Sequence, residues 1–119
     1  MSTLVLAALL QLASGDIPIE QAEALARRDE ATLQGEQASE FFDKQGKALG
    51  MALFKCGVTE AREASGLRVI MRLDAQGRVT KTWLNKPSVL GQCFEKELQS
   101  AAFPTDGRPE FYTFIGFSF

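Results

Sequence analysis

A pair of short alternating segments joined by a turn constrains the fold most. Residues 67–74 alternate between mainly polar positions and an apolar set, and a period of two is typical of a strand with one buried face. Gly77 follows in the segment Asp74–Arg78, and glycine adopts the positive φ angle that a tight turn requires. Residues 79–84 then return as a second strand, so the sequence predicts an antiparallel β-hairpin. The apolar set of the first strand is Leu67, Val69, Met71 and Leu73.

The second strand of this hairpin does not keep a clean period of two. Val79 and Trp83 share one face by simple alternation, while Leu84 falls on the other. One extra residue in a strand moves the residues after it to the opposite face. We therefore expect a β-bulge near Lys81 or Thr82.

Amphipathic helices are predicted before and after the hairpin. Residues 36–56 and 88–101 carry apolar side chains at i, i+3 and i+4 spacing, and Gly57 is a suitable terminator for the first of these helices. Residues 16–35 have only a thin apolar stripe and predict a peripheral helix. Residues 111–119 alternate again and predict a third strand, which makes the order helix, hairpin, helix, strand and places the chain in the α+β class.

Residues 1–15 are interpreted as a candidate signal peptide for secretion. An uncharged apolar run extends from Leu4 to Ala13, and small residues stand at positions −3 and −1 of a cut before Asp16. The run is shorter than the roughly 20 residues that span a bilayer, so we expect no transmembrane segment. Because no lysine or arginine precedes the run, the alternative is an ordinary uncleaved helix. Cleavage predicts a periplasmic or secreted protein, and an uncleaved helix predicts a cytoplasmic one.

The complete absence of histidine limits the chemistry. Histidine is the commonest metal ligand and the side chain best suited to proton transfer near neutral pH. Nucleophile pairs that depend on histidine are excluded, and most zinc sites are disfavoured. Catalysis by carboxylates alone would need two of them in one cleft, whereas here they have the scattered spacing of a solvated surface. A net charge of −2 gives no reason to expect nucleic acid. We expect no enzyme activity, metal or cofactor.

The two cysteines of the chain lie on core-facing positions of two different predicted helices. Cys56 ends the apolar stripe of residues 36–56, and Cys93 lies on that of residues 88–101. Both helices must cover the same face of the sheet, which favours a disulfide, and an exported chain would be oxidised. The alternatives are buried free thiols and a cytosolic enzyme that uses one of the thiols as its nucleophile.

The carboxyl-terminal sequence resembles a known family. The run GLRVIMRLDAQGRVTKTWL, followed by CFEKELQSAAFP and an aromatic last strand, is similar to the TonB C-terminal-like family over roughly residues 38–119. It resembles most the short cysteine-containing branch of gliding-motility and other envelope proteins. That branch has a helix ending in Cys, a G-x-V-x-hydrophobic strand, a D-x-x-G-x-V turn and a second Cys helix that ends in Phe-Pro. The corresponding residues here are Cys56, Leu67, Val69, Asp74, Gly77, Val79, Cys93, Phe103 and Pro104.

This resemblance implies a ββαβ core over residues 36–119, with a three-stranded antiparallel sheet and helices on one face. It also implies a location outside the cytoplasm and a binding role without catalysis. Energy-transducing members add a transmembrane anchor and a proline-rich spacer; this sequence shows neither pattern, so we do not expect it to transmit force. The segment before Leu33 matches no element of the family.

Two functions are therefore expected. The first is an interaction module of the bacterial cell envelope, which binds a protein or peptide at an unpaired sheet edge. Tyr112 and Phe114, on the second face of the last strand, are its candidate partner-binding residues, although both could instead pack under the amino-terminal helices. The second function is a secreted inhibitor or immunity-type protein that blocks one cognate enzyme. The sequence does not indicate an oligomeric state.

Overall fold

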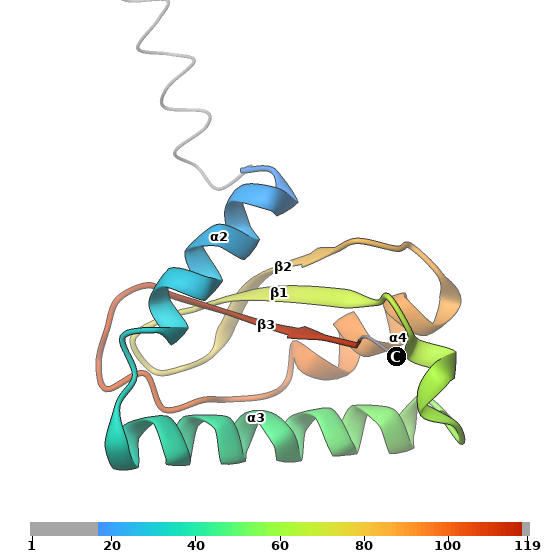
Figure 1. Cartoon of the computed structure of the whole chain (residues 1–119), viewed down its shortest axis with the longest axis horizontal. Coiled ribbons are helices and arrows are strands. Elements are labelled where there is room, and N and C mark those ends of the chain that lie inside the picture. Colours follow the sequence, from blue (N-terminus) through green and yellow to red (C-terminus); the bar gives the residue numbers. More distant parts are fainter. Residues whose placement is uncertain (1–16, 118–119) are drawn as a thin grey trace, which may run out of the picture.

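Helices cover both faces of one three-stranded sheet. The computed structural model describes residues 17–117, so the candidate signal peptide and its cleavage site lie outside the described residues. In Figure 1, α3 runs along one face of the sheet, α4 lies behind the strands, and α2 crosses the opposite face. The elements are α2 (Ile19–Glu30), α3 (Gly35–Lys55), the 3-10 turn η1 (Ala61–Ala64), β1 (Arg68–Leu73), β2 (Val79–Leu84), α4 (Val89–Leu98) and β3 (Phe111–Gly116).

The central strand of the sheet is β1. It pairs antiparallel with β2 on one side and with β3 on the other. The predicted α+β class, the hairpin and the three-stranded antiparallel sheet are confirmed. The strand predicted over residues 111–119 pairs as far as Gly116, and residues 118–119 lie outside the described residues.

Each face of the sheet has its own core. Val69, Met71 and Leu73 of β1 enter the larger core, which is covered by α3 and α4. Ile70 points the other way and packs beneath α2. The expectation that the helices of residues 36–119 lie on one face is therefore confirmed for α3 and α4, and α2, which precedes that core, covers the other face. The thin stripe of α2 suffices because its buried apolar residues are alanines, which let the helix lie close to the sheet.

The predicted helices are confirmed with slightly different ends. After α3, Gly57 adopts a φ angle of +72°, as expected of a helix terminator. Ser88 caps α4, and its hydroxyl oxygen accepts a hydrogen bond of 3.0 Å from the Gly91 amide. This helix ends at Leu98, three residues before the predicted end.

The hairpin turn is held by one carboxylate and one glycine. Asp74 Oδ1 accepts hydrogen bonds of 2.9 Å from the amides of Arg78 and Gln76, which hold the pKa of this carboxyl below its ordinary value. Gly77 has a φ angle of +77°, and a Cβ at this position would lie 1.6 Å from the Phe103 carbonyl oxygen. The Phe103 amide donates to the Gly77 carbonyl at 2.9 Å. The tertiary structure thus brings the D-x-x-G turn and the Phe-Pro segment into contact.

The predicted β-bulge is present in β2. Val79 pairs with Leu73 and Lys81 pairs with Arg72, so Thr80 is the additional residue. Its hydroxyl donates to the Arg72 carbonyl oxygen at 3.1 Å, which holds the bulge against β1.

The bulge decides which core each side chain of β2 enters. Val79 and Leu84 pack against the core of α3 and α4, whereas Trp83 lies in the core beneath α2. Simple alternation would have put Val79 and Trp83 on one face. The bulge lies at Thr80, next to the residues 81–82 predicted from the sequence.

Candidate partner-binding interface

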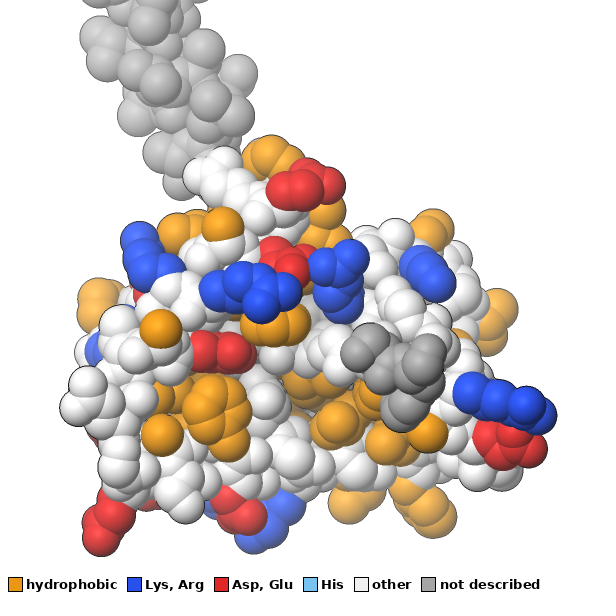
Figure 2. Space-filling view, in the orientation of Figure 1, with side chains coloured by type: hydrophobic (Ala, Val, Ile, Leu, Met, Phe, Trp, Pro, Cys, Tyr) orange, Lys and Arg blue, Asp and Glu red, His pale blue; other side chains and the backbone are white. Residues whose placement is uncertain are grey.

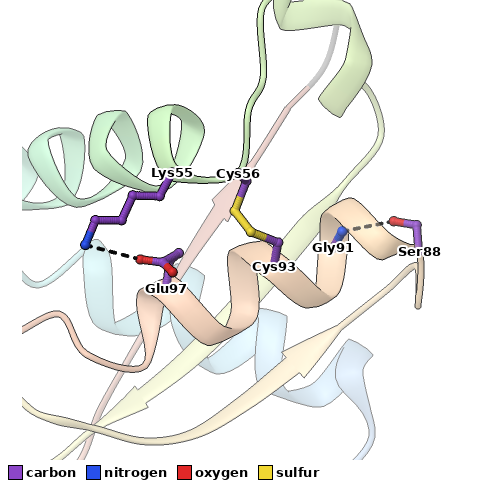
Figure 3. Close-up of a disulfide and its surroundings, with 6 residues drawn as sticks. All are labelled: Lys55, Cys56, Ser88, Gly91, Cys93 and Glu97. Atoms are coloured by element: carbon purple, nitrogen blue, oxygen red, sulfur yellow. Dashed lines mark hydrogen bonds and ion pairs between the residues drawn. A yellow bond between two sulfur atoms is a disulfide. The ribbon is translucent and has the colours of Figure 1, made fainter.

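A disulfide joins the two helices of the larger core. Cys56 follows the last turn of α3, and Cys93 lies in the middle of α4 (Figure 3). Their sulfur atoms are 2.01 Å apart and their Cα atoms 5.9 Å apart, so neither thiol is free. An ion pair of 3.7 Å between Lys55 and Glu97 links the same two helices. The predicted disulfide is confirmed, and the two interpretations that required free thiols do not describe this structure.

Removal of the disulfide is expected to destabilise the protein substantially. The combined change Cys56→Ala and Cys93→Ala should lower the free energy of unfolding by about 3–4 kcal/mol, because the unfolded chain regains the entropy of an open loop. Urea denaturation of the oxidised wild type, the reduced wild type and the double variant measures this loss. The last two should agree, and a loss below about 1 kcal/mol would contradict the expectation.

Two carboxylates from the end of α2 bind the outward-facing amides along the outer edge of β3. Asp29 Oδ2 accepts a hydrogen bond of 2.9 Å from the Tyr112 amide, and Glu30 Oε2 accepts one of 3.1 Å from the Phe114 amide. Glu30 also accepts a hydrogen bond of 2.5 Å from the Thr113 hydroxyl. Carbonyl oxygens of an added strand would need to reach these same two amides. This edge is therefore blocked by side chains that replace the missing strand.

The buried charge of Asp29 is compensated by two arginines. Its side chain is only 3% exposed, and its Oδ1 lies 3.1 Å from Arg28 Nη2 and 3.7 Å from Arg108 Nη2. The Arg108 guanidinium also lies over the ring of Phe111, 4.5 Å from its centroid. Because buried charges are tolerated when they are paired and hydrogen-bonded, these contacts allow Asp29 to remain beside the sheet edge.

Loss of the Asp29 carboxylate is expected to loosen α2 from the sheet. Asp29→Ala should lower the free energy of unfolding by about 2–4 kcal/mol, because it leaves the buried Tyr112 amide unpaired and Arg108 without its carboxylate. Urea denaturation monitored through Trp83 fluorescence measures the change. Glu110→Ala removes an exposed acid just before β3 and should change stability by less than about 0.5 kcal/mol. Equal effects of the two changes would contradict this role of Asp29.

The two candidate partner-binding residues lie beneath or beside α2. Tyr112 is only 4% exposed, and its ring packs 5.7 Å from that of Trp83. Phe114 is half-buried, with the Arg27 guanidinium 5.0 Å from its ring centroid. Their packing under an amino-terminal helix matches the alternative interpretation of both residues, and their role in binding stays a prediction.

The opposite edge of the sheet, along β2, is more open. The Asn85 amide donates to the Arg68 carbonyl of β1 at 3.2 Å. Since the amides of an antiparallel strand alternate in direction, those of Thr82 and Leu84 point away from β1. The edge is covered just before β2 begins, because Arg78 forms an isolated bridge with Ala102. Among residues 17–117, no strand lies beside the rest of this edge.

Both faces beside the open edge carry polar and aromatic groups. On the α2 side, Lys81 Nζ lies 5.4 Å from the ring centroid of Trp83, whose indole N–H donates to the Ile17 carbonyl at 2.9 Å. On the α4 side, the Thr82 hydroxyl donates to Glu95 at 2.6 Å. An added strand would find backbone groups at the edge and different side-chain chemistry on its two faces.

Comparison with protein-family models, with curated proteins and with solved structures gives no match for this chain. Within residues 17–117 there is no group of three or more His, Cys, Asp or Glu side chains that could hold a metal ion. No helix in this described part combines the length and the apolar character needed to cross a membrane.

Sequence reasoning missed the residues that distinguish the two edges. Asp29 and Glu30 are adjacent acids near the end of a helix, a common pattern, and nothing local indicates that they contact a strand 83 residues further on. The open position at Thr82 depends on the strand order, which alternation within one strand does not reveal.

Proposed function

We propose that this chain is a disulfide-stabilised, non-catalytic domain that binds a protein or peptide partner outside the bacterial cytoplasm, in the periplasm or cell envelope. The disulfide between Cys56 and Cys93 supports the compartment, because such bonds persist in oxidising environments and are rare in the cytosol. The proposal includes membership of the TonB C-terminal-like family, which the sequence pattern alone supports.

The open edge of β2 is the observation that carries the binding role. An extended segment of the partner would add a strand there and bond with the outward backbone groups of Thr82 and Leu84. Alternate side chains of that segment would meet Lys81 and Trp83 on one face and Glu95 on the other. Backbone bonds would supply much of the affinity, and these side chains would supply specificity.

Intact mass of the protein purified from its native source tests the compartment. We expect a chain that starts at Asp16 and weighs about 2 Da less than its fully reduced form, because export removes the signal peptide and oxidation removes two hydrogens. Reduction of the disulfide should raise the measured mass by these two hydrogens. A chain that starts at Met1 and contains two free thiols would contradict export.

A change at the open edge tests the binding role. Thr82→Pro removes one outward amide and should reduce capture of the partner from envelope extract at least about tenfold, because proline cannot donate to an added strand. Thr82→Val is the matched control: it loses the hydroxyl bond with Glu95 but keeps the amide, and it should retain capture.

Thermal unfolding of both variants verifies that the fold is intact. Equal capture by folded Thr82→Pro and by the wild type would show that the partner does not use this edge. The captured protein also separates the two functions expected from the sequence. A single stoichiometric enzyme that loses activity on binding would indicate the inhibitor.

A further inference from the structure

An apolar row on α3 faces solvent. Phe42 and Phe54 are 40% and 81% exposed, and exposed Gly46 and Gly50 lie between them at four-residue steps. Side chains four residues apart lie in one row along a helix. A Cβ at either glycine would meet no atom within 4 Å, so the protein itself leaves this part of the row uncovered. Figure 2 shows hydrophobic side chains projecting from the molecule on the side of α3.

This row reads the same in both directions: Phe, Gly, Gly, Phe. If two copies of α3 pack antiparallel about a two-fold axis between Gly46 and Gly50, each glycine faces the other glycine of the second copy. Phe42 then faces Phe54 of that copy, at both ends of the contact. A two-fold interface must be complementary to itself, and this order of residues meets that requirement. The glycines would let the helix backbones approach closely.

The exposed charges of α3 favour the same antiparallel arrangement. The exposed acids of α3, which are Glu36, Glu40 and Asp43, all precede its exposed lysines, which are Lys44, Lys47 and Lys55. Within one chain, Asp43 pairs with Lys47 at 3.2 Å and Lys55 pairs with Glu97 at 3.7 Å. An antiparallel pair sets the acidic start of each helix beside the lysine-bearing end of the other copy and brings Glu40 within one residue of the position opposite Lys55. A parallel pair would bring like charges together.

We propose that this chain forms a homodimer through antiparallel contact of α3 with α3 of a second copy, centred between Gly46 and Gly50. The contact involves one helix from each copy, so it belongs to the small, reversible class of interfaces. In Figure 1, α3 and β2 lie at different sides of the molecule. The dimer would therefore leave both β2 edges accessible and would present two partner-binding edges at once.

The first test adds bulk at the centre of the contact. Sedimentation equilibrium of the full chain between about 10 μM and about 1 mM should show a reversible monomer–dimer equilibrium. Gly50→Leu should raise the dissociation constant at least about tenfold, because its side chain separates the helices. Ala24→Leu places leucine at an exposed position of α2 and should leave the constant unchanged. Leucine is a good helix former, so neither change should lower the melting temperature.

The second test reverses charges. Glu40→Lys, and Lys55→Glu combined with Glu97→Gln, should each weaken the dimer, because each places like charges opposite one another. Glu97→Gln is included because Lys55 pairs with Glu97 within the chain, and a glutamate at position 55 would otherwise be repelled there. An equimolar mixture of the two variants should form a heterodimer with affinity close to that of the wild type, because both cross-helix pairs are then restored. A mixture that stays monomeric while the wild type dimerises would exclude the antiparallel arrangement.

Two further results would overturn the proposal. One is a wild type that remains monomeric at about 1 mM, and the other is Gly50→Leu that dimerises as strongly as the wild type. Sedimentation with phosphatidylglycerol vesicles tests whether the row binds a membrane instead of a second copy. If the chain stays monomeric, binds the vesicles and loses this binding on Phe54→Ser, the row would be assigned to a membrane surface. None of these measurements involves the β2 edge, so the dimer can fail while the proposed partner binding holds.

Discussion

The central strand β1 must bury both of its faces, and the other elements are placed by that requirement. Val69, Met71 and Leu73 need cover on one face and Ile70 needs it on the other. The helices α3 and α4 supply the first cover, and α2 supplies the second with small alanines that allow close approach. Because exposed apolar strand faces are costly in water, a sheet with helices on one side only would leave Ile70, Trp83 and Tyr112 unprotected.

The two edges of the sheet are protected differently. Asp29 and Glu30 accept hydrogen bonds from the outward amides of β3, so α2 covers both a face and an edge. The edge of β2 receives only a partial cover from the chain near Ala102, together with a bulge and a lysine, which discourage indiscriminate strand pairing. This asymmetry makes β2, and not the aromatic last strand, the part of the sheet best placed to accept a partner.

The disulfide stabilises a different part of the fold, the helices that cover the larger core. It ties the end of α3 to α4, and both helices cover the larger core. A small domain has a small core, so a covalent link between its covering helices contributes a large share of its stability. With its inner side held in this way, α3 presents its outer row to solvent on a fixed element. A rigid surface loses less entropy on binding, which favours association through that row.

The sequence by itself determined the local elements and much of their packing. Alternation revealed the hairpin and the last strand, the broken pattern before Leu84 revealed the bulge, and helical spacing placed Cys56 and Cys93 toward a common core. These features depend on residues that are close in the chain, or on burial of one helix side, so a single sequence contains their signal. The disulfide, the candidate feature with the clearest sequence signal, was predicted for this reason.

Only the tertiary structure decided where α2 lies and which sheet edge is open. The stripe of α2 is thin because its buried residues are small, and a weak amphipathic pattern does not specify the face that it covers. The bonds from Asp29 and Glu30 to β3 join residues more than 80 positions apart. Such contacts depend on how all the elements pack together, and no local pattern of side chains encodes them.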